Sequence, residues 1–238
     1  MKPWHWWRTV FYLIPAISLY TSVLGTASLV STLFDRSGNF GHRCARGWSW
    51  LILRTTGVKV RVEGLERLDP SRSYVFASNH QSIYDIPILF ASLPCQLRII
   101  AKASLGTIPF MGWHLQRTGH VLVDRSKPGA GVGVVKKMAR LVAAGHSLIV
   151  FPEGTRSLDG SVGRFKGGSF LIALEAGLPV VPISVQGSRH VMFRGRLMVC
   201  PGHVTVTVHE PIETAGVSRA AVREFSTRIH DIVASAAA

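Results

Sequence analysis

The spacing of apolar and polar positions divides the chain into an uncharged N-terminal stretch and an alternating globular part. No Asp, Glu, Lys or Arg lies between Arg8 and Asp35. From Val58 to Glu63, each valine is followed by a charged residue, which predicts a strand buried on one face. Further short apolar runs predict strands at residues 74–78, 97–101, 120–124, 147–151, 180–185 and 204–209.

Helical spacing fills the gaps between these strands. Apolar residues recur three or four positions apart in segments 86–93, 132–145 and 170–177, and again from Val222 to Val233, where Ser218 is the candidate N-cap. Strands that alternate with helices predict an α/β fold, with a single mostly parallel or mixed sheet covered by helices on both faces. We assign residues 57–238 to this α/β domain and residues 1–56 to an N-terminal membrane-attaching helical segment.

The N-terminal segment has the length and composition of a membrane-contacting helix. Its apolar run, Thr9 to Phe34, exceeds the roughly 20 residues that a bilayer span needs. A cleaved signal peptide, a true span and a shallow helical hairpin in one leaflet all fit this pattern. The arginines that follow the run favour a C-terminal domain on the cytoplasmic side of the inner membrane, while span and hairpin stay open. Tryptophans typical of the headgroup layer flank the run at Trp4, Trp6, Trp7, Trp48 and Trp50.

The overall charge is strongly positive and points to anionic partners. The chain has 27 Lys and Arg against 13 Asp and Glu, a formal net charge of +14. Such a surface suits nucleic acid, acidic lipid headgroups or phosphorylated substrates. The three cysteines are scattered without C-x-x-C spacing, which disfavours a disulfide framework or a structural zinc site. The sequence contains no phosphate-binding glycine loop and no G-x-S-x-G hydrolase elbow.

One short segment brings a histidine and a carboxylate together directly after a predicted strand. Asn79-His80 follows the strand of residues 74–78, and Asp85 lies five positions after His80. Histidine can take up a proton near neutral pH, and a nearby carboxylate can orient its ring. On one regular helix the two side chains would lie on different faces, so we expect a turn with Asp85 folded back toward His80. Pro87 suits the first helical turn that would follow.

Two further polar clusters follow predicted strands. Glu153 and Arg156 lie in the run Phe151-Pro152-Glu153-Gly154-Thr155-Arg156-Ser157, and Asp124-Arg125 ends the strand of residues 120–124. Arginine can bind phosphate or carboxylate through two hydrogen bonds. Taken alone, each cluster is also typical of an exposed ion pair. In the same way, Asn79 and Asp85 taken alone are typical of turn and cap residues. Because ligands bind beyond the carboxyl ends of strands in open α/β sheets, we expect these clusters and His80 to converge on one rim.

Together these segments resemble a known family. Asn79-His80 with Asp85, segment 119–125, segment 151–157 and Val181-Pro182-Ile183 fall in the order of the four sequence blocks of the glycerolipid acyltransferases. Within that family the chain most resembles the bacterial 1-acylglycerol-3-phosphate acyltransferases. The NHxxxxD and FPEGTR blocks are specific together, whereas the other two are weak patterns, and the second lacks the expected aromatic residue before Asp124.

The resemblance implies an O-acyltransferase of phospholipid synthesis. His80, oriented by Asp85, would act as general base on the sn-2 hydroxyl of lysophosphatidic acid. That hydroxyl would attack an acyl thioester of coenzyme A or acyl-carrier protein directly, with no metal and no cofactor, giving phosphatidic acid. The implied substrate-binding residues are Arg125, Glu153, Gly154, Thr155 and Arg156.

Other functions fit parts of the same sequence. The same chemistry on another lysolipid acceptor would leave the four blocks unchanged. A non-catalytic membrane-bound protein that binds lipid or nucleic acid would need only the apolar N-terminus and the positive charge, but it would not need both His80 and Asp85. No RNP-type aromatic motif supports nucleic-acid binding.

Overall fold

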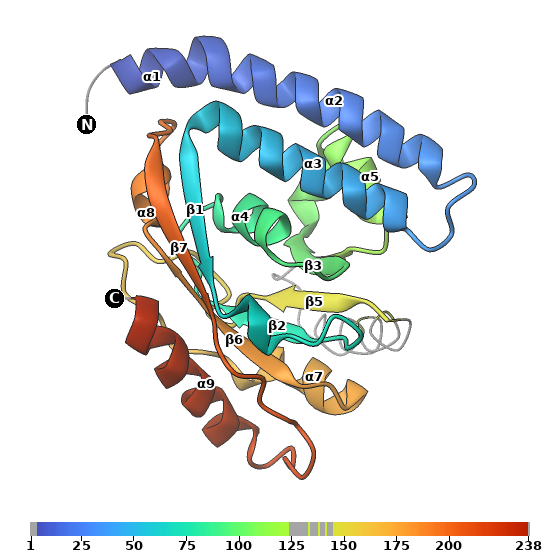
Figure 1. Cartoon of the computed structure of the whole chain (residues 1–238), viewed down its shortest axis with the longest axis vertical. Coiled ribbons are helices and arrows are strands. Elements are labelled where there is room, and N and C mark those ends of the chain that lie inside the picture. Colours follow the sequence, from blue (N-terminus) through green and yellow to red (C-terminus); the bar gives the residue numbers. More distant parts are fainter. Residues whose placement is uncertain (1–3, 124–132, 134–137, 139–140, 142–144, 238) are drawn as a thin grey trace.

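Seven strands of the described chain form one mixed sheet through the middle of the molecule (Figure 1). The computed structural model describes residues 4–123, 133, 138, 141 and 145–237. The strand order is β1-β7-β6-β2-β5-β3-β4, and all neighbouring strands are parallel except β6 and β7, which are antiparallel. The strands are β1 (Val58–Glu63), β2 (Val75–Ser78), β3 (Leu97–Lys102), β4 (Val121–Val123), β5 (Ser147–Val150), β6 (Val180–Gln186) and β7 (Gly202–Val208).

Helices cover both faces of this sheet. In Figure 1, α2, α3, α4 and α5 lie on one face, and α7 and α9 lie on the other. A π-helical turn, Thr9–Leu13, joins α1 to α2, so that the N-terminal helix is continuous from Trp4 to Ser31. The helices are α1 (Trp4–Arg8), α2 (Ile14–Ser31), α3 (Asn39–Thr56), α4 (Asp85–Ser92), α5 (Met111–Arg117), α7 (Leu171–Ala176), α8 (Ser188–Val191) and α9 (Val222–Ala237).

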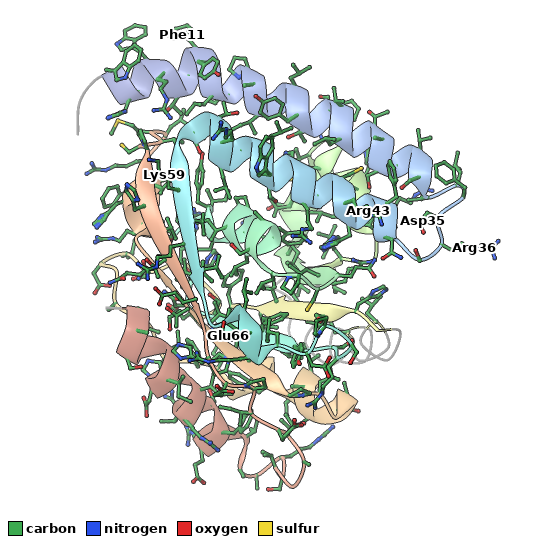
Figure 2. All side chains as sticks on the ribbon, in the orientation of Figure 1. Phe11, Asp35, Arg36, Arg43, Lys59 and Glu66 are labelled. Carbon is green, nitrogen blue, oxygen red and sulfur yellow. The ribbon has the colours of Figure 1, made fainter. Side chains whose placement is uncertain are left out.

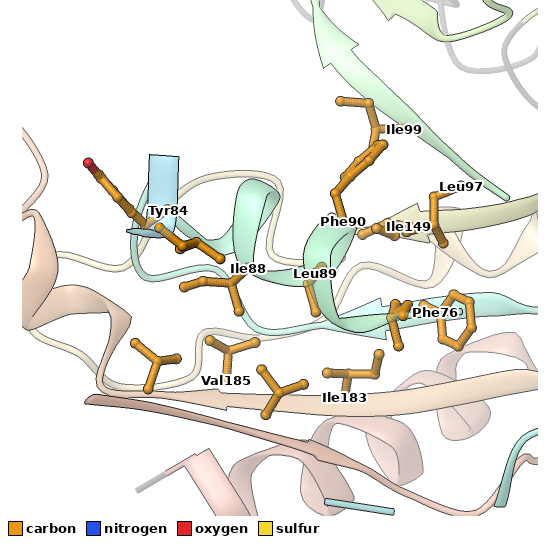
Figure 3. Packing of buried hydrophobic residues seen from close by; sticks show 14 of the residues in the cluster. Phe76, Tyr84, Ile88, Leu89, Phe90, Leu97, Ile99, Ile149, Ile183 and Val185 are labelled. Carbon is orange, nitrogen blue, oxygen red and sulfur yellow. The ribbon is translucent and has the colours of Figure 1, made fainter. Parts of the chain in front are cut away.

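Alternation along the central strands builds two apolar cores. Phe76 of β2 and Ile149 of β5 face the core under α3 and α4, whereas their neighbours Val75 and Leu148 face the core under α7 and α9. Both sets are buried, which explains why these strands read as continuous apolar runs. Figure 3 shows the first core, where Ile88 and Leu89 of α4 lie above Ile183 and Val185, with Phe76 and Ile149 to their side.

The predicted α/β fold is confirmed. Each predicted strand agrees with the structure within two residues, apart from the end of segment 120–124, where Asp124 lies outside the described residues. The helix predicted over residues 132–145 also lies mostly outside the described residues. The N-cap prediction was wrong: α9 begins at Val222, and Ser218 accepts the N–H of Ala221 in the turn before it. Local polar side chains can close a turn without starting the helix that follows.

The N-terminal helix packs against α3 and leaves its outer side uncovered. Trp48 of α3 donates an indole hydrogen bond to Thr21 of α2 at 2.9 Å. Over the span-length window of this helix only 11% of residues are buried. Phe11 is 67% exposed and points away from the sheet (Figure 2). The helix is therefore long and apolar enough to cross a bilayer, while its inner side contacts the sheet domain. The division at residues 56 and 57 into two domains stays a prediction.

Candidate active site

His80 and Asp85 meet at the carboxyl end of β2. The chain leaves β2 at Ser78, turns through Asn79 to Tyr84, and enters α4 with Asp85 as its first residue. His80 Nδ1 lies 2.8 Å from Asp85 Oδ2, so the predicted fold-back of the carboxylate is confirmed. An ionised carboxylate only accepts hydrogen bonds, which favours the proton on Nδ1 and leaves the Nε2 lone pair available. The His80 side chain is 16% exposed and Asp85 is fully buried, so the ring is the accessible part of the pair.

Asp85 also shapes the loop that carries His80. The same Oδ2 atom accepts the backbone N–H groups of Gln81 and Ser82 at 2.8 and 2.9 Å. These contacts fold the preceding loop back around the carboxylate at the start of α4. The other oxygen, Oδ1, is buried and has no hydrogen-bond partner among the described residues. Asp85 therefore holds both the backbone of the turn and the ring of His80.

Glu153 holds the main chain of His80 from the neighbouring loop. One carboxylate oxygen accepts the His80 N–H at 2.8 Å, and the other accepts the Gly163 N–H at 3.1 Å. The side chain is 8% exposed. Burial raises the pKa of Glu153, although the two main-chain donors act in the opposite direction. Glu153, predicted to bind substrate, thus has both oxygens engaged by backbone groups of this chain.

The rest of the loop clamps His80 from two more directions. The N–H of Ser157 donates to the His80 carbonyl at 2.8 Å. The ring of Phe151 stacks on the imidazole, with centroids 4.1 Å apart and planes at 21°. These contacts fix both the peptide and the ring plane of His80. Because β5 lies beside β2 in parallel, the loop after β5 is delivered to the same edge as the loop after β2.

Asn79 ties this edge to a third strand. Its side-chain N–H donates to the carbonyl of Val185 at 2.9 Å, and its side-chain oxygen accepts the Val185 N–H at 2.8 Å. Asn79 is fully buried. From the sequence it reads as a turn residue, but the amide completes the backbone pairing at the end of β6. The burial of this amide, which the sequence does not show, is what identifies the role.

Three of the remaining predicted substrate-binding residues lie on the loop after β5, and the fourth lies outside the described residues. Gly154 adopts φ 76°, a left-handed backbone conformation that favours glycine. Thr155 is exposed and Arg156 is partly exposed on the rim. Arg125, together with Asp124, lies outside the described residues, so convergence of that cluster on the rim stays a prediction. Of the predicted clusters, the structure brings together those that begin at His80 and at Glu153.

An apolar cavity adjoins α4 on the side of the N-terminal helices. Its volume is about 220 Å³, and its wall is almost entirely carbon. Ile83 and Ile86, which flank Asp85 in the sequence, line it together with residues of α2, α3 and α5. Other lining residues include Leu24, Ala45, Trp48 and Met111.

The arrangement provides an oriented base, and an apolar space adjoins the helix that begins with Asp85. His80 has an oriented ring, a buried carboxylate behind it and arginine at the rim, which suits removal of a proton from a hydroxyl. Among the described residues, no three His, Cys, Asp or Glu side chains gather as metal ligands would. The prediction that the reaction needs no metal or cofactor stays a prediction.

Known proteins are similar to this chain in sequence. A family model described as Acyltransferase matches residues 59–186. The chloroplast 1-acyl-sn-glycerol-3-phosphate acyltransferase of Brassica napus is 39% identical over 76% of this chain and 53% of its own length. The enzyme of the same name from Saccharomyces cerevisiae is 30% identical over 86% of this chain and 68% of its own length. The chain thus spans about half the length of the Brassica relative.

A solved structure matches almost the whole chain. The crystal structure of the 1-acyl-sn-glycerophosphate acyltransferase PlsC from Thermotoga maritima matches with a TM-score of 0.82 at 26% sequence identity. The match covers 99% of this chain and 98% of that one. The likeness therefore includes the N-terminal helices as well as the sheet.

Proposed function

Because this chain belongs to the acyltransferase family, we propose that it transfers a fatty acyl group from a thioester to the sn-2 hydroxyl of 1-acylglycerol-3-phosphate. The product is phosphatidic acid. The observation that carries this proposal is the 2.8 Å contact between His80 Nδ1 and the buried carboxylate of Asp85. That contact leaves Nε2 as the proton acceptor at the carboxyl edge of the sheet.

The reaction proceeds in one addition and one elimination. His80 Nε2 takes the proton of the sn-2 hydroxyl as the oxygen attacks the thioester carbonyl carbon. The carbon–sulfur bond then breaks, and the thiolate leaves and regains a proton from the imidazolium. Asp85 stabilises the imidazolium that exists between these steps. The donor is the thioester of coenzyme A or of acyl-carrier protein.

Arginine binds the phosphate in this proposal. Arg156, on the loop that holds His80, and Arg125 supply planar donors for the phosphate oxygens. Gly154 and Thr155 shape the loop between Glu153, which holds His80, and Arg156, which binds the phosphate. For Glu153 the hydrogen bonds to His80 and Gly163 favour a positioning role over direct contact with substrate.

The apolar cavity holds an acyl chain. It lies between α4, which begins with Asp85, and the N-terminal helices, so an acyl group there extends away from the catalytic pair into a carbon-lined space. A chain that leaves water for this cavity gains free energy from every methylene that it buries.

The N-terminal helix lies in one leaflet of the membrane with the catalytic domain on the cytoplasmic side. α2 packs along α3, whose exposed Arg43 and Arg54 would have to enter the hydrocarbon layer if α2 crossed it. A shallow position instead buries exposed side chains such as Phe11 and Leu19 in lipid and leaves those arginines near headgroups. The catalytic edge then opens close to the surface where the lysolipid resides, which we place at the inner membrane.

The test is acyl transfer by the purified full chain from long-chain acyl thioesters to lysophosphatidic acid. We expect wild type to form phosphatidic acid and His80→Ala to lose about 10²–10⁴-fold in rate. His203→Ala, which removes an exposed histidine of β7, is the matched control and should retain activity. Unfolding curves establish that each variant is folded. Equal rates for His80→Ala and wild type would refute the base assignment, and acylation of a different lysolipid alone would refute the acceptor.

A further inference from the structure

A loop outside the segment matched by the family model connects the catalytic edge to the N-terminal helix. It comprises residues 192–199, between α8 and β7, and we call it the arginine loop. The Cys200 N–H donates to the Val191 carbonyl at 2.8 Å and closes its base. Gly195, at φ 79°, forms the tip of a turn in which the Arg196 N–H donates to the Phe193 carbonyl. The arginine loop is therefore a defined structure with an exposed tip.

Three hydrogen bonds fix this loop between the membrane helix and the catalytic edge. Val199 N–H donates to Thr9 Oγ1 of the N-terminal helix at 2.9 Å. Ser82 Oγ, from the loop that carries His80, donates to the Met192 carbonyl at 2.9 Å. Arg194 Nη1 donates to the carbonyl of Arg156 at 2.6 Å. In Figure 1 the orange turn that leads into β7 accordingly lies directly beneath α1.

The exposed tip combines positive charge with apolar surface. Arg194, Arg196 and Leu197 are exposed, and Leu197 keeps 54% of its surface in contact with solvent. The guanidinium groups of Arg189 and Arg196 lie over the Phe193 ring at 5.2 and 5.8 Å from its centroid. No carboxylate in the described part of the chain forms a salt bridge with Arg189 or Arg194. An exposed leucine that directly follows arginines is typical of segments that insert an apolar side chain at a headgroup layer.

We propose that the arginine loop is a second membrane-contact element, which binds the phosphate groups of anionic lipids next to the catalytic edge. This rests on the proposed membrane position of the N-terminal helix. The hydrogen bond from Val199 joins the base of the loop to the inner side of that helix, where Thr9 is buried. In this arrangement Leu197 of the exposed tip enters the apolar boundary, while Arg194 and Arg196 reach headgroup phosphates. The loop thereby holds the catalytic edge close to the layer in which an anionic lysolipid lies.

The experiment measures binding of the full chain to vesicles of phosphatidylcholine alone or mixed with an equal amount of phosphatidylglycerol. One basic residue near an anionic surface changes the binding constant about fivefold, so Arg194→Gln/Arg196→Gln should weaken binding to the anionic vesicles by about 30-fold. Binding to neutral vesicles should change little, and high salt should remove the difference. Leu197→Ser should weaken binding to both kinds of vesicle.

The control removes the same charge from the opposite face. Arg223 and Arg228 are exposed on α9, which Figure 1 places on the far side of the sheet from α1 and α2. Arg223→Gln/Arg228→Gln should bind anionic vesicles almost as wild type does. Equal losses in both double variants, or no loss in either, would overturn the proposal.

A docking role for the loop toward a protein would give a different result. Vesicle binding would then be unchanged in Arg194→Gln/Arg196→Gln, while transfer from acyl-carrier protein would fall far more than transfer from coenzyme A. That outcome also overturns the lipid assignment. Because vesicle binding is measured without turnover, a failure here is distinct from a failure of the proposed acyltransferase activity.

Discussion

The carboxylate of Glu153 accepts the main-chain N–H of His80 at 2.8 Å. This contact joins the loop after β5 to the loop after β2, and the Ser157 N–H completes the clasp at the His80 carbonyl. The two most specific sequence blocks of the chain are thereby one structural unit. A catalytic base must be held within a fraction of an ångström of its working position, and the clasp provides that restraint.

Replacing Glu153 should lower turnover without weakening substrate binding. Glu153→Ala removes both acceptors, so His80 loses a support of its peptide, and we expect kcat to fall about 10²-fold with KM for the lysolipid nearly unchanged. Glu153→Gln retains the side-chain shape and one acceptor, so its kcat should lie between those of wild type and Glu153→Ala. Exposed Glu224 on α9 provides the control, Glu224→Ala. A rise in KM at constant kcat would instead show that Glu153 contacts the substrate.

Filling the apolar cavity should shorten the preferred acyl chain. Ala45 lines the cavity, so Ala45→Phe introduces a ring into the space that we assign to the acyl group. Rates with long-chain thioesters should fall by about tenfold or more relative to short-chain ones, since burial of each methylene contributes about 0.8 kcal/mol. Val23 of α2 is 57% exposed, so Val23→Phe adds the same ring outside the cavity and should leave the acyl-chain preference unchanged. A uniform loss for all chain lengths in Ala45→Phe would place the acyl group elsewhere.

A cluster of buried and half-buried histidines should make the protein sensitive to acid. Burial, with the charge of Arg98 contributing next, lowers the pKa of His42, His114 and His146 to about 4, and burial also lowers the pKa of His120. The unfolded chain titrates these groups near 6.5 and binds more protons than the folded chain between the two values. Stability should therefore be full above that range and decrease as the pH falls from 6.5 toward 4.

His42→Gln tests this directly. The positive charge of Arg46 and the neighbouring His114 also lower the pKa of His42. Only the carbonyl of Cys95 acts in the opposite direction. We expect the free energy of unfolding of the variant to fall less steeply with acidification, by up to about 1.4 kcal/mol per pH unit. Urea unfolding in detergent at several pH values gives the slopes, with exposed His203→Gln as control. Parallel slopes for wild type and His42→Gln would contradict the assignment.

The leaflet position of the N-terminal helix predicts that both of its ends face the same side of the membrane. Single cysteines introduced at His5 and at exposed Arg36, in a chain with Cys44, Cys95 and Cys200 replaced, should react with an impermeant thiol reagent from the cytoplasmic side only. A helix that lies in the headgroup boundary has no end beyond the bilayer. Reaction of the two positions from opposite sides would establish a span.

Local patterns in the chain were enough to predict the sheet and the contact between His80 and Asp85. Alternating valines predicted β1, and uniformly apolar runs predicted β2, β5 and β6, because burial on one or both faces determines which residues a strand tolerates. The five-residue separation of His80 and Asp85 excluded one continuous helix and thus predicted the turn that the structure contains.

Contacts between distant segments decided the rest. Glu153 in a Pro-Glu-Gly turn has the same sequence pattern whether its carboxylate faces a substrate or a main-chain N–H, and only the packing of β5 beside β2 selects the second. The length and composition of the N-terminal helix are the same whether it crosses the bilayer or lies in one leaflet. Its packing on α3 is what favours the position in one leaflet that we propose. The sequence by itself determined what each segment becomes, since burial and turn geometry act over a few neighbours. The partners of Glu153, Asn79 and Thr9 required the tertiary structure, because they lie 73, 106 and 190 residues away along the chain.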